Sequence, residues 1–213
     1  MKAPTFHNSV FINCPFDEEY APLFEAMIFC CIYAGFQPQL ANVSLENGEN
    51  RFEKISNLIK ASQYSVHDLS RCRAEKEGEF LRMNMPFECG LDFGFRKSGN
   101  AMLRRKKFLI FEHSRYDLKK SMSDIAGQDP EHHNGDYQIV IRKFRDFLRV
   151  EAGINIAGPT KVISDYTDFQ AWLVEKKISE GHSEAEALSL PTRERIDEMK
   201  FWLKAGKPLP ETN

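Results

Sequence analysis

The sequence predicts an α/β protein: a doubly wound, mostly parallel sheet in flavodoxin-like strand order, with a C-terminal helical extension. Two observations carry this prediction. Short apolar runs alternate with helical segments along the first 112 residues, as in parallel sheets whose strands are joined by helices on both faces. Beyond residue 112 the periodicity becomes helical.

Four apolar segments have the length and flanking turns of buried strands. The first ends at a turn that contains Cys14 and Asp17. The second contains Pro38, which cannot donate a backbone hydrogen bond and therefore indicates an edge strand. The predicted strands cover residues 10–13, 36–41, 63–69 and 107–112.

Apolar residues at helical spacing predict a helix after each of the first three strands. Gly35 follows the first helix where a C-cap glycine belongs, and Pro86 fits the first turn of the third. These helices cover residues 18–34, 52–59 and a segment that begins at residue 84.

The C-terminal part is expected to be largely helical. A strong helix is predicted over 137–150, a linker over 153–159, a capping box at Ser183 and Glu186, and a last helix over 196–204. We therefore divide the chain into an α/β domain over residues 1–150 and a helical appendage over residues 151–213 packed on it.

The charge balance argues against a nucleic-acid partner. The chain has 29 Lys and Arg against 31 Asp and Glu, a formal net charge of −2, so no global basic field attracts a phosphate backbone. One run, Arg104-Arg105-Lys106-Lys107, is locally basic just before a predicted strand. A solvated start of that strand explains the run, and contact with polyphosphate or another anionic partner is the alternative.

Cysteine usage and the N-terminal residues predict a cytoplasmic protein. The five cysteines are irregularly spaced, which argues against a disulfide framework or a zinc cage. The first residues lack the apolar segment of a signal peptide, and the apolar stretch over 26–36 is too short to span a bilayer. Homo-oligomerisation through apolar C-terminal helices that contain Trp172 and Trp202 stays open.

Missing motifs exclude several chemistries. The sequence contains no G-x-S-x-G elbow, no P-loop and no G-x-G-x-x-G fingerprint. His132 and His133 share a polar loop with Asp129 and Asp136, but their spacing matches no zinc pattern. We expect neither a metal site nor a cofactor.

Glu88 is the main candidate for chemistry, and we expect it in the first turn of its helix. There the helix dipole and the unpaired amides favour negative charge, which predicts a carboxylate ionised near neutral pH. Asp92 shares its helical face, and Asp68 ends the third strand, facing the pocket in place of the preceding His67. We therefore expect three carboxylates around one crevice. Ordinary helix-start and turn preferences are the alternative for each.

Binding residues are expected at the same edge, because ligands of doubly wound sheets bind outside the carboxyl ends of the strands. The loop of Asn13, Pro15 and Phe16 could present amides to a ribose or phosphate, or be a plain turn. Arg51, near a helix start, could bind a phosphate bidentately, or be an ordinary surface arginine.

Four segments together resemble a known group of proteins: VFINCPFDEEY, RFEKISNLIKAS, QYSVHDLS and NMPFECGLDFGF. Over residues 10–112 the chain is similar to the nucleoside 2-deoxyribosyltransferase-like branch, which is structurally akin to TIR domains. In deoxyribosyltransferases a helix-start glutamate attacks the anomeric carbon, and in TIR-type NAD hydrolases an equivalent glutamate serves cleavage of the nicotinamide–ribose bond. The resemblance implies this role for Glu88, sugar-hydroxyl binding by Asp68, and sugar contact by the loop after the first strand.

The resemblance therefore predicts an N-glycosidic bond hydrolase or transferase that acts on a nucleoside, nucleotide or NAD. Its expected site combines catalytic Glu88 and Asp68 with substrate-binding Asn13, Pro15, Phe16, Arg51 and Asp92. The alternative is a nucleotide-signal-binding or self-assembling TIR-like module in bacterial defence or stress signalling, without catalysis.

Overall fold

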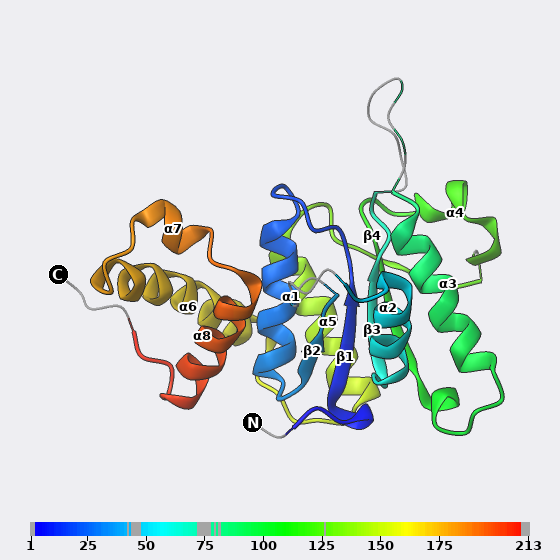
Figure 1. The fold of residues 1–213 in the computed structure, drawn as a ribbon, viewed down its shortest axis with the longest axis horizontal. Helices are drawn as coiled ribbons and strands as arrows, with labels where there is room; N and C mark the ends of the chain where they lie inside the picture. The colour runs from blue at the N-terminus through cyan, green and yellow to red at the C-terminus, as the bar shows by residue number, and fades with distance from the viewer. Residues whose placement is uncertain are drawn as a thin grey trace.

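The computed structural model describes residues 3–41, 43, 48–71, 78, 80, 82–125 and 127–209. Its strands are β1 (Ser9–Asn13), β2 (Gln37–Gln39), β3 (Tyr64–Asp68), β4 (Lys107–Glu112) and β5 (Glu131–His132). They form one sheet in the order β2-β1-β3-β4-β5, and every neighbouring pair is parallel. Helices cover both faces of this sheet (Figure 1). The doubly wound fold and the flavodoxin-like order are confirmed.

The central strands β1 and β3 are buried along their whole length. Their register pairs Val10 with Tyr64 and Asn13 with His67, so both strands end at the same edge of the sheet. The edge position predicted from Pro38 is confirmed, because β2 pairs only with β1 among the described strands. Strand β5 was not predicted, since two residues are too short to show a strand periodicity.

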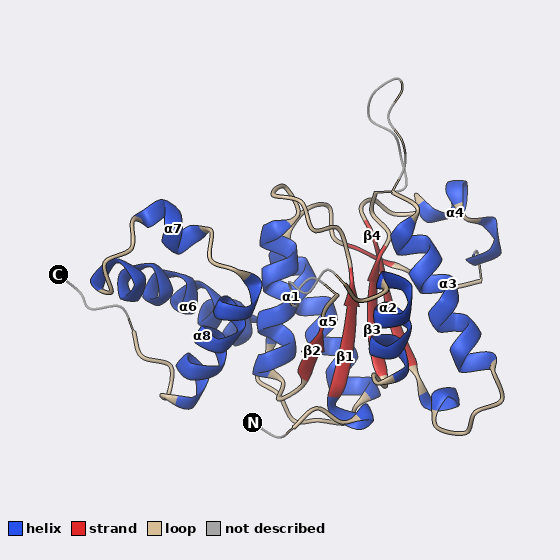
Figure 2. Ribbon diagram, viewed as in Figure 1, coloured by secondary structure: helices blue, strands red, loops and turns tan. Residues whose placement is uncertain are grey.

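Helices α1 (Ala21–Tyr33) and α5 (Tyr137–Glu151) cover one face of the sheet, and Figure 2 shows the strands between the helical layers. This face buries alternate strand residues such as Val10, Val66 and Phe111 in one cluster with both helices. Gly35 ends α1 with a φ of 84°, a left-handed conformation that glycine adopts without steric cost.

Helices α2 (Arg51–Lys60) and α3 (Asn84–Lys97) cover the other face. Phe11 of β1 packs there against Ile59 of α2, and Ile110 of β4 packs against the start of α3. Asn50 caps α2 by accepting hydrogen bonds from the amides of Phe52 and Glu53. Short helical elements complete the described chain at η1 (Phe6–Asn8), η2 (Leu103–Arg105), α4 (Leu118–Ser121) and η3 (Ser123–Ile125).

The C-terminal layer consists of α6 (Pro159–Ser179), α7 (Glu184–Leu188) and α8 (Thr192–Lys204), and it packs on α1 (Figure 1). Its main contact is aromatic: Phe29 of α1 lies 5.6 Å from Phe169 of α6 and 6.0 Å from Trp202 of α8, measured between ring centroids. All three rings are fully buried and belong to the core that lies against the sheet. The capping box predicted at Ser183 is confirmed.

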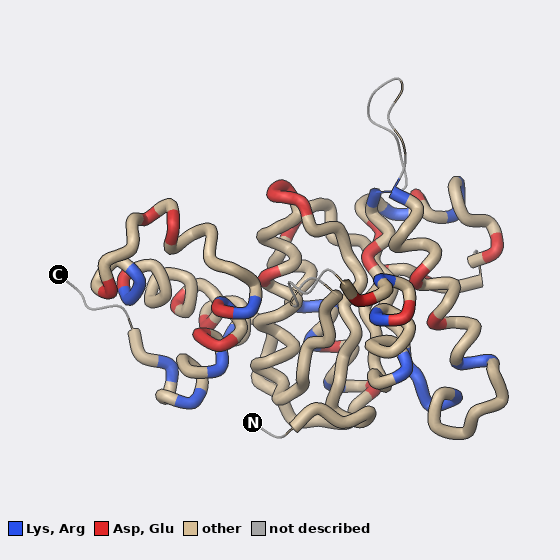
Figure 3. The backbone as a smooth tube through the Cα atoms, in the orientation of Figure 1, with Lys and Arg blue, Asp and Glu red and all other residues tan. Residues whose placement is uncertain are grey.

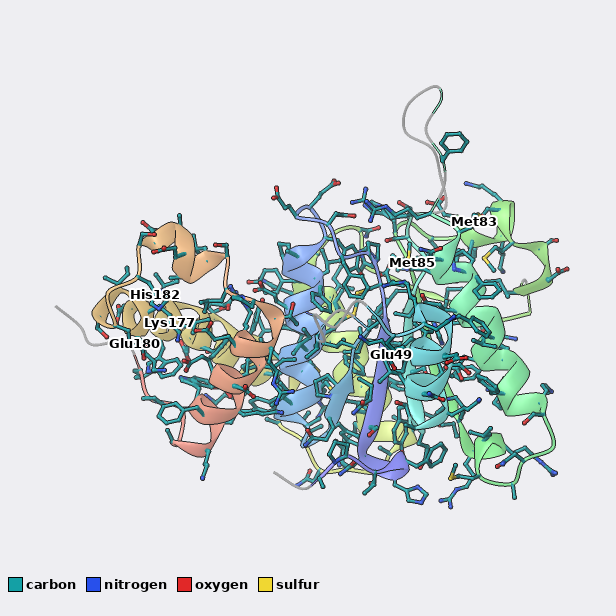
Figure 4. The ribbon with its side chains drawn as sticks, in the orientation of Figure 1. Glu49, Met83, Met85, Lys177, Glu180 and His182 are labelled. Atoms are coloured by element: carbon teal, nitrogen blue, oxygen red, sulfur yellow. The ribbon has the colours of Figure 1, made fainter. Side chains whose placement is uncertain are left out.

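A second contact holds the C-terminal helices together. The buried ammonium of Lys177 donates to Glu194 at 2.9 Å and lies 2.8 Å from Glu198, and both carboxylates belong to α8. Figure 4 labels Lys177 with Glu180, its third acidic partner, in this layer. The three carboxylates raise the pKa of the Lys177 ammonium, so it stays charged although it is buried.

The four described cysteines are free and buried, as expected for thiols that act as small apolar side chains. Cys72 lies outside the described residues. None of the described helices is both long and apolar enough to cross a bilayer.

The shared aromatic core predicts that the C-terminal helices unfold together with the sheet. Phe169→Ala is expected to lower the free energy of unfolding by about 3–5 kcal/mol, because it leaves a cavity between α1 and α8. Urea unfolding followed by tryptophan fluorescence reports on α6 and α8, which carry both tryptophans, and circular dichroism reports on the whole chain. The two transitions should coincide and shift together.

The matched control is Val150→Ala, which shortens an exposed apolar side chain on α5 and should change stability by no more than about 0.5 kcal/mol. Separate fluorescence and dichroism midpoints in the wild-type protein would show that the C-terminal helices are an independent unit, against this prediction.

Candidate functional site

The candidate site lies at the carboxyl edge of the sheet, where β1 and β3 end and α2 and α3 begin. The side-chain amide of Asn13 joins these elements. Its Nδ2 donates to the carbonyl oxygen of Met85 at 2.9 Å and lies 3.0 Å from Nδ1 of His67. Figure 4 labels Met85 near the start of α3. Asn13 therefore fixes the first turn of α3 on the end of β1, and both of its N–H donors are used there.

Glu88 lies in the second turn of α3, because the helix begins at Asn84. The expectation of a first-turn glutamate kept ionised by the helix dipole is therefore wrong. The side chain is buried, and this burial raises its pKa from the ordinary 4.5 to about 7, while the charge of Arg51 acts in the opposite direction. Glu88 accepts no hydrogen bond from the described residues. With a pKa of about 7, its carboxyl is close to half-ionised at neutral pH.

The thiol of Cys14 lies near Glu88 and the other acidic groups at this edge. Burial raises the pKa of the Cys14 thiol, and the negative charges of Asp68, Glu88 and Asp17 raise it further. Each of these carboxylates is therefore close enough to act on one buried sulfur atom. Glu88 and Asp68, the two residues predicted to be catalytic, thus lie at the same edge of the sheet.

Asp68 is completely buried and surrounded by donors. Oδ2 accepts a 2.5 Å hydrogen bond from the hydroxyl of Tyr20 and lies 3.0 Å from Nε2 of His133, while Oδ1 accepts from the amide of Ser70 at 2.9 Å. The amide of Gly135 donates to Nδ1 of His133, so Nδ1 is an acceptor and the ring N–H is on Nε2, on the side of Asp68.

Tyr20 and His133 were not predicted as partners of Asp68. Tyr20 precedes α1 and His133 follows β5, and only the folding of the chain brings them together. The burial of the Tyr20 hydroxyl and the charge of Asp68 raise the pKa of the phenol, so Tyr20 stays a proton donor. The sequence around His133 suggests only metal ligation, and its spacing matches no zinc pattern.

Asp92 lies on the opposite face of the sheet from the partners of Asp68. Its Oδ2 accepts from the hydroxyl of Ser65 at 2.6 Å and lies 3.2 Å from Nε2 of His67, and Oδ1 lies 3.2 Å from the ammonium of Lys106. The expected ring of three carboxylates around one crevice is therefore wrong. Asp92 is fully buried beneath α3, and the only charged group at ion-pair distance from its Oδ1 among the described residues is the ammonium of Lys106, so Asp92 is placed to balance the charge of Lys106.

His67 and Asp68 point to opposite faces of the sheet. His67 points toward α3, where it contacts Asn13 and Asp92, and Asp68 points toward Tyr20 and His133. The expected alternation of neighbouring strand residues is confirmed.

Two exposed aromatic residues adjoin Arg51 and Glu88 in the sequence. Phe52 follows Arg51 and Phe87 precedes Glu88, and their ring centroids are 6.1 Å apart. Both side chains are more than half exposed, at 52% and 60%. Large apolar side chains are costly to expose, so this pair is a candidate contact for a planar ligand.

The loop after β1 has one buried and one exposed predicted residue. Pro15 is buried, and Phe16 is 40% exposed with its ring packed edge-on against Phe24 at 5.2 Å. Asp17 follows and forms ion pairs with two arginines. Its carboxylate lies 2.9 Å from the guanidinium of Arg71 and 3.2 Å from that of Arg82. The loop therefore carries an apolar ring and a charged cluster, but its contact with a ligand stays a prediction.

An open groove of about 1260 Å³ lies away from this edge, against β2, α1 and α8. It is lined by none of the predicted site residues. We place the candidate site by its chemistry, because the buried carboxyl with a raised pKa and its charged neighbours lie at the carboxyl edge. Within the described part of the chain, no three His, Cys, Asp or Glu side chains are arranged to hold a metal ion.

Comparisons of the chain with protein-family models, curated proteins and solved structures found no match.

Burial of Glu88 predicts a pH-dependent stability difference between the wild type and Glu88→Gln. Because the native pKa is raised, Glu88 contributes stability that is complete below pH 4.5 and is lost as the pH rises through about 7. From pH 5 to pH 8 the wild type should therefore lose stability relative to the glutamine variant. The loss should be at most about 3 kcal/mol, because each unit of pKa shift corresponds to about 1.4 kcal/mol. Urea unfolding at both pH values measures this difference.

Glu184→Gln is the matched control, because Glu184 is exposed on α7 and its replacement should leave the pH dependence unchanged. A Glu88→Gln difference that is the same at pH 5 and pH 8 would contradict a raised pKa at this position.

Proposed function

We propose that the protein cleaves or exchanges an N-glycosidic bond in a nucleoside, nucleotide or NAD, with Glu88 as the reacting carboxylate. The observation that carries this proposal is a buried glutamate with a raised pKa and no hydrogen-bond partner among the described residues, at the ligand-binding edge of a doubly wound sheet. The resemblance to nucleoside 2-deoxyribosyltransferase-like and TIR-like proteins supports the same chemistry.

The reaction would break the bond between the anomeric carbon and the base nitrogen. The base leaves with the bonding electron pair, and positive charge develops on the sugar as an oxocarbenium ion. The ionised carboxylate of Glu88 either bonds to the anomeric carbon or stabilises its charge, and water or a second base then completes hydrolysis or transfer. Because the charge is larger in the transition state than in the substrate, a buried carboxylate favours the transition state.

Arg51 and the neighbouring aromatic rings would bind the two ends of such a substrate. The guanidinium of Arg51 is exposed at the first residue of α2 and could accept a phosphate with a bidentate pair of hydrogen bonds. The exposed rings of Phe52 and Phe87 could stack on a nucleobase. A nucleoside 5′-phosphate fits this arrangement better than a neutral nucleoside.

Asp68 is proposed as a positioning residue. Its carboxylate is completely buried and is already engaged by Tyr20, His133 and the Ser70 amide. It would hold the Tyr20 hydroxyl and the His133 imidazole at the end of β3 in place of binding a sugar hydroxyl directly. Asn13 would act in the same way, since its amide donors hold the first turn of α3.

A second candidate is a nucleotide-binding module without catalysis. The observation in its favour is the continuous packing of the C-terminal helices on α1, because α1 begins directly after Tyr20 and the Asp17 loop. A ligand bound at the carboxyl edge could therefore change how the C-terminal helices pack on α1. Binding of a nucleotide without any product after long incubation would favour this candidate.

The proposed reaction predicts release of free base from at least one member of a panel of nucleosides, nucleoside 5′-phosphates and NAD. The rate should rise with pH through about 7 as Glu88 ionises. Glu88→Gln keeps the size of the side chain and removes the carboxylate, so the rate should fall by more than about tenfold, or 1.4 kcal/mol. Chromatography of the reaction mixtures measures both effects.

Glu184→Gln, on the distant helix α7, should retain the wild-type rate. A Glu88→Gln rate within tenfold of the wild type would remove Glu88 from the reaction, and an inactive wild type across the panel would remove the reaction itself.

A further inference from the structure

A cationic cavity, wide open to solvent, lies at the edge of the sheet opposite to Glu88, where α3 ends and β4 begins. Its volume is about 550 Å³, within the range of about 300–1,000 Å³ that is common for small-molecule sites. Figure 3 shows Lys and Arg gathered around this end of α3 and β4. The lining consists of five cationic residues and one glycine: Arg96, Lys97, Gly99, Arg104, Lys106 and Lys107.

Two of the five cations are balanced by the protein itself. Lys106 is buried, and its ammonium contacts Asp92 and donates to the carbonyl oxygens of Ile59 and Ser62. Two of its N–H donors are therefore used by carbonyl oxygens, and its charge is balanced by Asp92. Lys107 lies 3.0 Å from the carboxylate of Glu151. These lysines contribute to the electric field of the cavity, but a carboxylate already balances the charge of each.

The other three cations, Arg96, Lys97 and Arg104, have no carboxylate at ion-pair distance within the described chain. The guanidinium of Arg96 lies over the rings of Phe93 and Phe108, at 5.0 Å and 4.4 Å from their centroids. Arg104 donates one hydrogen bond to the carbonyl oxygen of Gly99 at 2.9 Å. Both planar groups are thus held in place while most of their donors stay available, which lowers the entropic cost of binding.

Ordinary helix-end preferences explain only part of this arrangement. The C-terminus of α3 carries a partial negative charge of about one half, which favours Arg96 and Lys97 in the last turn. Asp124 adds one carboxylate in an adjoining hollow that Arg96 and Lys97 also line. With Arg104, three full positive charges still exceed these nearby negative charges.

We propose that this cavity binds a compact, phosphate-rich anion, namely a polyphosphate chain, either free or as the tail of a nucleoside triphosphate. Arginine forks match phosphate oxygens bidentately, and a compact polyanion can contact Arg96, Lys97 and Arg104 at once. The proposal is independent of the reaction at Glu88. It gives a role to the basic run that begins at Arg104, for which an anionic partner was the alternative in the sequence.

Isothermal titration calorimetry of the full chain at about 150 mM salt tests this site, with tripolyphosphate and a nucleoside triphosphate in separate arms. We expect both to bind, and Arg104→Gln and Lys97→Gln each to weaken tripolyphosphate binding by about 3–10-fold, and by more when combined. Arg105→Gln removes the next cation along the chain, which does not line the cavity, and should change the affinity less than about twofold. Thermal melts verify that each variant is folded.

Two kinds of outcome would overturn the proposal. Equal losses in Arg104→Gln and Arg105→Gln would indicate diffuse attraction to the basic surface in place of a site. Binding of neither ligand by the wild type, or binding that Arg104→Gln and Lys97→Gln leave unchanged, would also overturn it. A higher affinity for one of the two polyphosphate ligands, with the same dependence on Arg104, would identify the source of the phosphate chain.

Discussion

The structure of the site depends on how α3 is attached to the sheet. The Asn13 amide holds the Met85 carbonyl in the first turn of the helix, and beneath the helix Asp92 contacts His67 and Lys106. Every one of these groups is buried, so a polar group that lost its partner there would cost free energy. This constraint fixes the position of α3, and with it the position of the glutamate one turn beyond Met85.

Three buried carboxylates, one on β3 and two on α3, therefore have three different environments. Asp68 is surrounded by the Tyr20 hydroxyl, the His133 imidazole and a backbone amide, and Asp92 faces a lysine. Glu88 has neither a hydrogen-bond donor nor a lysine as a partner among the described residues, and burial is the largest influence on its pKa. A buried carboxyl without a hydrogen-bond partner among the described residues is the one best placed to respond to charge on a ligand.

The sequence predicted four of the five described strands because burial periodicity and turn residues are local signals, as the edge position of Pro38 illustrates. It also placed Glu88 near the carboxyl edge of the sheet. The environment of Glu88 was mispredicted, because whether a second-turn side chain is buried depends on packing that no local pattern encodes. The same holds for Asp92 and its partner Lys106, and for Tyr20 with Asp68, since these pairs join distant parts of the chain.

The central claim is that Glu88 is a buried carboxyl whose pKa lies near 7 and is held down by Arg51. An NMR titration of the side-chain carboxyl carbon, with Glu88→Gln used to assign the signal, measures this directly. A midpoint near pH 7 that moves upward in Arg51→Gln is the expected result, because the opposing charge is removed. A midpoint near 4.5, or one that does not respond to Arg51, would contradict the account.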